Sequence, residues 1–208
     1  MTRPVRRKQP SFTISPKVAI LGAIILGFSY AGTEIYKYHN SYHDIDGIWK
    51  ACFTPNQRCQ RLILQQISEA KQSILVQAYG FSDNDIVEAL IKAKDRGVNV
   101  SVILDHSNLT SKHSGLSKIL SHQIPVRIDK PAGLAHSKNI IIDNHILIGG
   151  SYNFSRGAYQ RNAENVLIVH DKTLAAQYIN NWQNRWALSV SPLKIKKTKA
   201  EPLSNNHH

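Results

Sequence analysis

Acidic side chains are scarce in this sequence, which has 14 Asp and Glu against 26 Lys and Arg and a formal net charge of +12 over 208 residues. The excess lies mostly at the ends. Residues 1–17 hold five basic side chains and no acidic one, and the last twenty residues hold four lysines against Glu201. Only +4 remains for the middle of the chain. A basic chain favours an anionic partner but does not distinguish DNA, RNA and an anionic membrane, and solvated tails without a partner are the alternative.

Cysteine is nearly absent, since Cys52 and Cys59 are the only two. The intervening Pro55-Asn56 turn brings the ends of this segment together, so the pair can form a disulfide in an oxidising compartment. Two unpaired thiols are the alternative. A second cysteine pair is missing and the nearby histidines are irregularly spaced, so we expect no metal at this position.

A hydrophobic run long enough to span a membrane comfortably is also missing. Residues 18–32 supply fifteen apolar-leaning positions, short of the ~20 that a bilayer requires. After a basic stretch such a run is typical of a secretory signal peptide, and Ser29 and Ala31 offer small residues for cleavage. An uncleaved anchor that associates with the membrane through 18–32 is the alternative. Residues 1–33 therefore predict a periplasmic or secreted protein, or one anchored to the inner membrane.

The sequence contains no internal repeat, and after the linker at 34–50 helical and strand periodicities alternate. The alternation predicts one α/β domain over 51–188, with a mixed, mostly parallel β-sheet flanked by helices on both faces, and a flexible basic tail at 189–208. The predicted strands are 73–79, 98–104, 124–129, a hairpin at 138–148, and 164–169; the predicted helices are 58–71, 82–97, 114–122 and 171–187.

The hairpin begins with polar residues that suit phosphate chemistry. His136, Lys138 and Asp143 form the pattern H-x-K-x4-D. Alternate side chains of a strand share a face, so the imidazole and the ammonium should project together. A neutral imidazole is a competent nucleophile when its second nitrogen is held by an acceptor, which makes His136 the candidate to attack phosphorus. Asp143, at the corner of the hairpin, is expected to cap turn amides rather than to act as a base.

A second polar group follows the hairpin. Gly150, Ser151 and Asn153 form the pattern G-S-x-N, which places a hydroxyl and an amide on a common face near the histidine. The glycine removes a side chain where the backbone must come close to a ligand. Lys138 and Asn153 are expected to bind the non-bridging oxygens of a phosphate. Glu164, on the next strand, is the candidate acceptor that orients the imidazole.

These two motifs together resemble the signature of the phospholipase D superfamily. The segments CFTPNQRC, VQAYGF and EALIKAKDRGVNVSVILD further resemble the short bacterial Nuc-type endonucleases, so that the likeness covers about 50–187. The resemblance implies the phospholipase D/nuclease fold and a phosphohistidine intermediate that water hydrolyses. It assigns the nucleophile or acid to His136, phosphate binding to Lys138, Ser151 and Asn153, and orientation of the histidine to Glu164.

A second copy of the motif is missing, although the mechanism needs one histidine to attack and another to protonate the leaving oxygen. We therefore expect a homodimer that sets His136 against its symmetry mate in one shared active site. The sequence also lacks a carboxylate cluster suited to Mg²⁺, so we expect no cofactor and a metal-independent reaction.

The substrate is less well determined than the reaction. A nonspecific endonuclease that hydrolyses DNA, and also RNA, is the first hypothesis, and basic residues such as Lys112, Arg156 and Arg161 near the cleft would favour it. A phospholipase D that hydrolyses phosphatidylcholine or a related lipid to phosphatidic acid and a free headgroup is the alternative. A membrane-anchored enzyme acting on RNA or cardiolipin, as in the mitochondrial branch, is less favoured, and a nucleic-acid-binding protein without turnover is the non-enzymatic alternative.

Overall fold

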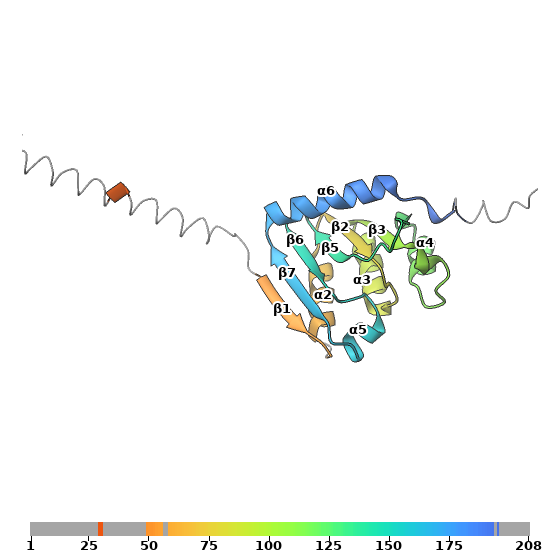
Figure 1. Ribbon diagram of the computed structural model, residues 1–208, viewed down its shortest axis with the longest axis horizontal. Helices are drawn as coiled ribbons and strands as arrows, with labels where there is room; N and C mark the ends of the chain where they lie inside the picture. Colours follow the sequence, from red (N-terminus) through yellow and green to blue (C-terminus); the bar gives the residue numbers. More distant parts are fainter. Residues whose placement is uncertain (1–28, 31–48, 56–57, 194, 196–208) are drawn as a thin grey trace, which may run out of the picture. The chain divides into compact units, whose positions relative to one another are not determined.

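The computed structural model describes residues 29–30, 49–55, 58–193 and 195 (Figure 1). Most of the segment 18–32 and nearly all of the linker expected at 34–50 lie outside these residues. In the described part of the chain, no helix has both the length and the apolar character needed to cross a bilayer.

One seven-stranded sheet organises the described residues from Trp49 onward, with the strand order β1-β7-β6-β5-β2-β3-β4. The α/β class and the mixed sheet predicted from the sequence are confirmed. The strands are β1 (Trp49–Phe53), β2 (Ser73–Ala78), β3 (Asn99–Asp105), β4 (Val126–Asp129), β5 (Lys138–Ile142), β6 (Ile146–Gly150) and β7 (Asn165–His170).

The prediction that the sheet is mostly parallel is wrong. Only the pairs β2–β3 and β3–β4 are parallel, whereas β1–β7, β7–β6, β6–β5 and β5–β2 are antiparallel. Parallel pairing needs a long crossover such as the α3 connection. The chain between β5 and β6 is instead a tight turn in which Asp143 and Asn144 have positive φ angles of 50° and 60°, the conformation that closes an antiparallel hairpin.

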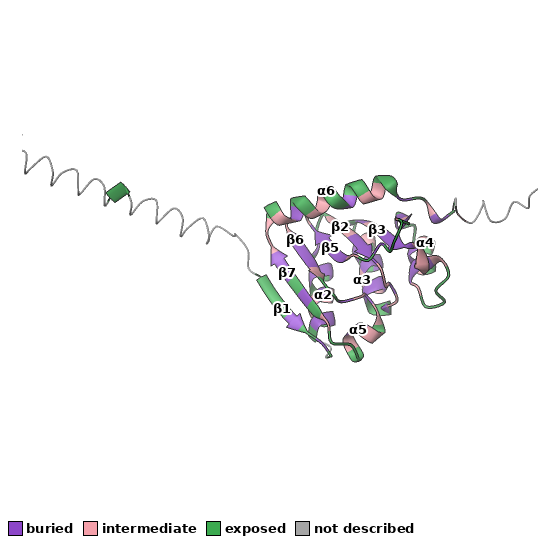
Figure 2. Cartoon of the chain, in the orientation of Figure 1, coloured by how far each residue is buried: buried purple, intermediate pink, exposed green. Residues whose placement is uncertain are grey.

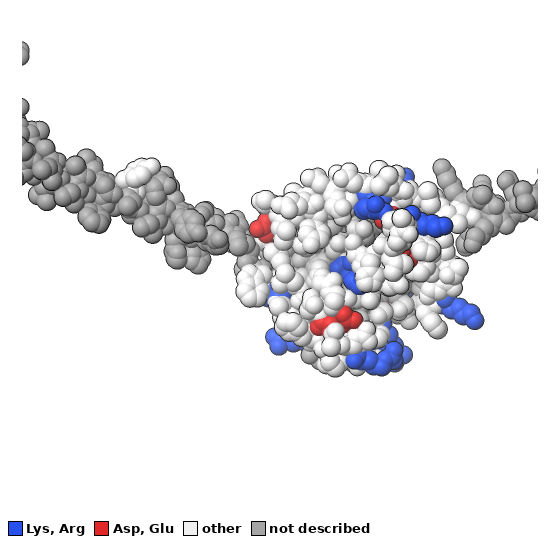
Figure 3. All heavy atoms as spheres, viewed as in Figure 1, with Lys and Arg blue, Asp and Glu red and all other residues white. Residues whose placement is uncertain are grey.

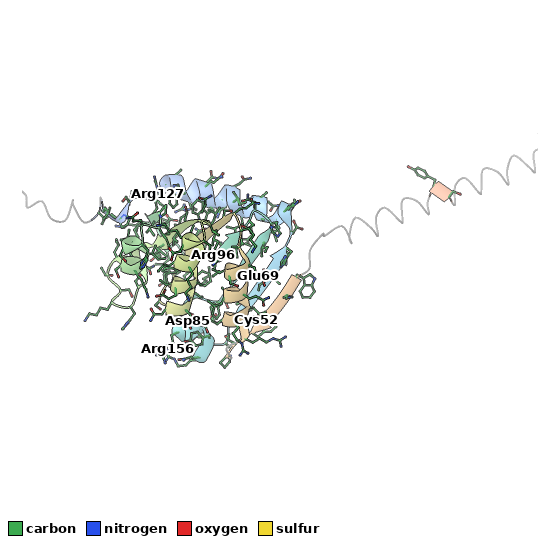
Figure 4. The ribbon with its side chains drawn as sticks, turned by 180° about the vertical axis from the view of Figure 1, so that it is seen from behind. Cys52, Glu69, Asp85, Arg96, Arg127 and Arg156 are labelled. Carbon is green, nitrogen blue, oxygen red and sulfur yellow. A yellow bond between two sulfur atoms is a disulfide. The ribbon has the colours of Figure 1, made fainter. Side chains whose placement is uncertain are left out.

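Helices cover both faces of the sheet, as the sequence predicted. A large apolar cluster packs α2 and α3 on one face, and a smaller cluster around Trp182 packs α6 on the other. Figure 4, seen from behind, shows α2 and α3 in front of the strands. The helices are α2 (Arg58–Glu69), α3 (Asn84–Asp95), α4 (Leu116–Ser121), α5 (Arg156–Gln160) and α6 (Lys172–Leu188), with a 3₁₀ turn η1 (His106–Leu109).

The central strands form the core because they are apolar on both sides. β5 is buried at every residue, and Figure 2 shows the middle strands in the colour of buried residues. Ile140 and Ile142 face the α2 and α3 side while Ile141 faces α6. Burying each such side chain contributes ~1.5–3 kcal/mol before the entropy of ordering is subtracted. The hairpin that begins at Lys138 is therefore held in the most rigid part of the molecule.

Two boundaries differ from the sequence prediction. The linker expected to end at residue 50 overlaps β1, an edge strand whose mostly exposed residues give no clear alternation. A disulfide joins Cys52 of this strand to Cys59 of α2, and Figure 4 labels Cys52 at that place. The tail expected from residue 189 is ordered at its start, because Ile128 and Val190 exchange two backbone hydrogen bonds.

Candidate active site

His136 and Lys138 lie together at the start of β5. Lys138 is the first residue of the strand and His136 precedes it, so the histidine is not on the strand as the sequence analysis expected. The Lys138 ammonium donates to the backbone oxygen of His136 at 2.6 Å, and its Nζ lies 3.0 Å from His136 Nδ1. The spacing of two residues therefore brings the two groups into direct contact, although the strand begins only at the second of them.

The burial of Lys138 and the charges near it affect the pKa of its ammonium. The residue is 8% exposed, and burial lowers the pKa of the ammonium, while the nearby charge of Glu164 acts in the opposite direction. An ammonium that donates to Nδ1 places the ring proton of a neutral imidazole on Nε2. A phosphate oxygen that accepted a hydrogen bond from this ammonium would compete with Nδ1 for it.

Tyr79 is a residue of the site that the sequence analysis did not single out. Its ring centroid lies 4.5 Å from that of His136 and 5.1 Å from the Lys138 ammonium. The Tyr79 amide donates to the Ser137 oxygen at 3.0 Å. An aromatic residue at the end of a buried strand was the available signal, but only the antiparallel pairing of β2 with β5 places it beside the histidine.

Asp105 anchors the loop that leads into His136. Its carboxylate is fully buried and accepts hydrogen bonds from the backbone amides of Ala135, at 2.9 Å, and Ser107. Burial alone would raise the pKa of this carboxyl, but the hydrogen bonds from Ser107 and Ala135 outweigh it and the pKa is lowered. No motif in the sequence marks Asp105, because its partner is 30 residues away.

Gly150 lies against the neighbouring strand at a position where a side chain would not fit. Its φ is +142°, and an added Cβ would lie 2.3 Å from the backbone oxygen of Asn165 in β7. Gly149 has open space at the corresponding position. The absence of a side chain at Gly150 also lets the chain leave β6 against β7 and deliver Ser151 to the site.

Glu164 and Ser151 bind each other in the structure. The Ser151 hydroxyl donates to Glu164 Oε2 at 2.6 Å, and Asn162 donates to Oε1 at 2.9 Å. The expected hydrogen bond from His136 to Glu164 is not formed within one chain, where the carboxylate accepts from Ser151 and Asn162 and keeps a free lone pair on each oxygen. The serine expected to bind phosphate thus has its proton committed to Glu164.

Asn153 is oriented by the backbone of Gly80. The Gly80 amide donates to the Asn153 side-chain oxygen at 3.2 Å, which leaves the amide NH₂ group as the donor for a phosphate oxygen. A side chain at Gly80 would meet this same oxygen at 3.1 Å. The small residue before Phe81 therefore allows the asparagine to lie close to the end of β2.

Asp143 lies at the other end of β5, away from His136. Its carboxylate accepts three backbone hydrogen bonds, from Lys71, Gln72 and Ser73, at 2.7–2.9 Å. These amides connect α2 to β2. The last residue of the H-x-K-x4-D pattern thus joins the hairpin turn to a neighbouring loop instead of entering the site.

Apart from Asp143, the residues of the two motifs line one open hollow of about 380 Å³ at the ends of the strands. Such a volume accommodates a phosphate with its substituents. Within the described residues no three His, Cys, Asp or Glu side chains gather as a metal site would need. The hollow is lined by His136, Lys138, Gly150, Ser151, Asn153 and Glu164.

Comparisons with known proteins agree with this geometry. Residues 63–186 match the family model of the cardiolipin synthase, PLD-like domain. A phospholipase D of Rickettsia bellii is 41% identical over 198 residues, which cover 88% of this chain and 98% of that protein. A mitochondrial cardiolipin hydrolase of Chlamydomonas reinhardtii is 29% identical over 59% of this chain and 55% of its own length.

Among solved structures, Nuc from Salmonella typhimurium, a phospholipase D family member, superposes with a TM-score of 0.66 at 33% identity and covers 69% of this chain and 97% of its own. The fold and the hollow thus define a phosphodiester hydrolase with a histidine and a lysine at its centre. The chain belongs to the phospholipase D superfamily, which confirms the resemblance inferred from the two motifs.

Proposed function

We propose that this protein is a phospholipase D, which hydrolyses the headgroup ester of a phospholipid through a phosphohistidine on His136. The observation that carries the proposal is the phospholipase D of Rickettsia bellii, 41% identical across almost its whole length. Further rickettsial relatives bear the same name, among them one of Rickettsia conorii at 51% identity over 136 residues. This choice reverses the preference for an endonuclease that the sequence alone suggested.

In the proposed first step, Lys138 and the Asn153 amide bind the non-bridging oxygens of the phosphodiester and oppose the charge that develops on them. A nitrogen of His136 attacks phosphorus, the bond to the headgroup oxygen breaks, and that oxygen takes a proton from a second, protonated histidine. In the second step water attacks phosphorus, the same second histidine accepts its proton, and the nitrogen–phosphorus bond breaks. The products are phosphatidic acid and the free headgroup alcohol.

The second histidine is proposed to come from another copy of the chain. His136 is the only histidine that lines the hollow in the described part of the chain, and the hollow is open on one side, where a twofold-related copy would place its own His136. Glu164 remains the proposed acceptor for an imidazole in that complete site. The reaction is proposed to need no metal, since the two Lys138 side chains supply positive charge.

A phospholipid substrate fits the location that we propose. Residues 18–32, read as a signal peptide or an anchor, would place the domain outside the cytoplasm or at the inner membrane. Leu134, 55% exposed and close to His136 in the chain, offers an apolar contact beside the site.

An endonuclease is the second candidate, favoured by the likeness to Nuc over 97% of that chain and by the sequence resemblance to Nuc-type endonucleases. Both activities use the same chemistry on a phosphodiester, so the site residues alone do not separate them.

The deciding experiment incubates the purified full chain, in excess EDTA, with phosphatidylcholine vesicles, plasmid DNA and RNA in parallel. We expect release of choline and no nicking of DNA. The His136→Asn variant should bind vesicles and release nothing. Cleavage of DNA without choline release would establish the endonuclease instead, and absence of any turnover in the wild type would leave a binding protein. Loss of activity in EDTA that Mg²⁺ restores would remove the histidine mechanism.

A further inference from the structure

A second hollow, of about 650 Å³, lies beside the active site and has a strongly basic lining. Its four cationic side chains come from the loop after η1, from α4, from α5 and from the residue that follows α5. The remaining lining residues are small or neutral, with one histidine, and include no Asp or Glu. In Figure 3, blue side chains gather at the lower end of the domain, where Figure 1 shows α5. We name this hollow, with Lys112, Lys118, Arg156 and Arg161, the basic hollow.

One segment of chain forms the wall between the two hollows. Asn153 lines the active site, and Arg156, three residues later, lines the basic hollow. The Phe154 oxygen between them accepts from the Ser82 and Asp83 amides at 2.8 and 2.9 Å, and the Phe154 amide donates to Gly80. Phe154 itself is 2% exposed. The wall is thus rigid, and an anion in the basic hollow would sit at a fixed place next to the phosphate in the active site.

The cations of the basic hollow are poorly neutralised by the protein. Lys118 pairs with Glu88, and Arg156 donates to the uncharged Gln160 side chain at 3.1 Å. Among the described residues, Lys112, Arg156 and Arg161 form no ion pair. Like charges held around one concave space repel each other, so an anion that enters the hollow gains attraction and also relieves this repulsion.

We propose that the basic hollow binds the phosphate of an acidic phospholipid headgroup while the active site holds the substrate lipid. The proposal extends the phospholipase D function and rests on it. Lys112, Arg156 and Arg161 were expected from the sequence to favour a nucleic-acid substrate if they lay near the cleft. A nucleic-acid strand, however, carries one charge for every ~3.4 Å of its axis and needs cations spaced along a track, whereas these residues and Lys118 surround one compact space. A zwitterionic headgroup would bring its own cation into the hollow and bind weakly.

The proposal is tested by the number of lipids that one dimer binds, because the shared active site takes one headgroup and each of the two basic hollows takes another. The probes are dispersed short-chain phosphatidylglycerol and phosphatidylcholine, titrated by calorimetry into the full chain carrying His136→Asn so that no turnover occurs. We expect three phosphatidylglycerol molecules per dimer, one in the shared active site and one in each basic hollow, but one phosphatidylcholine per dimer. Adding Arg156→Gln and Arg161→Gln should reduce the phosphatidylglycerol number to one and leave the phosphatidylcholine number unchanged.

A control variant that removes the same number of charges elsewhere separates loss of the basic hollow from a general loss of positive charge. Lys71 and Lys172 are exposed and lie at the opposite end of the sheet, where β2 begins and β7 ends. The Lys71→Gln, Lys172→Gln variant should therefore keep all three phosphatidylglycerol sites of the dimer. Equal loss in both double variants would overturn the proposal. So would inorganic phosphate that occupies the second site as tightly as the lipid, or a loss of plasmid DNA binding without loss of the lipid site. Because binding is measured without turnover, failure here is distinguishable from failure of the phospholipase activity.

Discussion

At the residue scale, the site depends on the contact between one buried ammonium and one exposed imidazole. The Lys138 Nζ lies 3.0 Å from Nδ1 of His136, and burial lowers the pKa of the ammonium. A phosphate restores a full opposite charge to the lysine, so binding the substrate anion raises that pKa again.

Tyr79 is expected to position this pair without touching the substrate. Removing its ring with Tyr79→Leu should lower kcat by about three- to tenfold, since ring contacts of this kind contribute ~0.5–1.5 kcal/mol. The Tyr79→Phe variant keeps the ring and should retain near wild-type kcat. The pH profile of kcat is the diagnostic measurement: its limbs should move in the leucine variant, whereas an unchanged profile would mean that Tyr79 acts only in packing.

Substitutions at the neighbouring glycines Gly150 and Gly149 can be compared to test what the end of β6 requires. Gly150→Ala would force a Cβ against the Asn165 oxygen at a positive φ, so we expect a loss of at least ~2 kcal/mol in the free energy of unfolding. Gly149→Ala has open space and should change stability by less than ~1 kcal/mol. Urea denaturation measures both, and equal effects would show that β7 does not set the requirement at Gly150.

At the element scale, the active site is assembled from the ends of strands that are distant in the sequence. β2 brings Tyr79, β5 brings the histidine and lysine, and β6 and β7 bring Ser151 and Glu164. The loops at this edge are held by single buried groups, such as Asp105 under the loop before His136. The rigidity of the site is thus a property of the sheet and of these anchors.

Asp105 carries a prediction about this loop. Because its folded pKa is lowered from the usual 3.8, its stabilisation is present above that value and is lost as the pH falls through the lower folded pKa. Asp105→Asn should cost ~1–3 kcal/mol at pH 7 and lower kcat through a less ordered His136. The difference in unfolding free energy between wild type and variant should narrow in acid; a difference that stays constant down to pH 2 would contradict the assigned role.

At the scale of the whole molecule, the described domain supplies one of the two histidines that the proposed mechanism uses. One chain presents one imidazole in an open hollow, whereas the two-step mechanism uses two histidines with opposite protonation. Under the proposed mechanism we expect a bell-shaped pH dependence of kcat, because one histidine must be neutral while the other is charged; a flat profile between about pH 5 and 9 would count against the pair.

Mixing subunits tests the shared site directly. If each active site needs two copies of His136, refolding wild type together with an equal amount of His136→Asn should leave about one quarter of the activity per total protein, because only wild-type pairs are complete. Independent sites would leave about half. Sedimentation of the mixture should show dimers throughout, and a fully active monomer would refute the shared site.

The sequence by itself determined the local parts of this protein. Hydrophobic periodicity located the strands from β2 onward and the principal helices, because burial on one or both faces repeats with the period of each element. The spacing of His136 and Lys138 placed their side chains together, since two residues on an extended chain share a side. The combined motifs also identified the superfamily.

Only the tertiary structure decided what depends on contacts between distant segments. It made the sheet mostly antiparallel, added β1 at its edge, and directed Glu164 to Ser151 instead of His136. It also brought Tyr79 and Asp105 to the histidine, and Lys112 to Arg156 and Arg161 around the basic hollow. Periodicity and spacing describe neighbours along the chain, whereas strand order and side-chain partners follow from how separate elements pack, and that packing is a property of the folded chain as a whole.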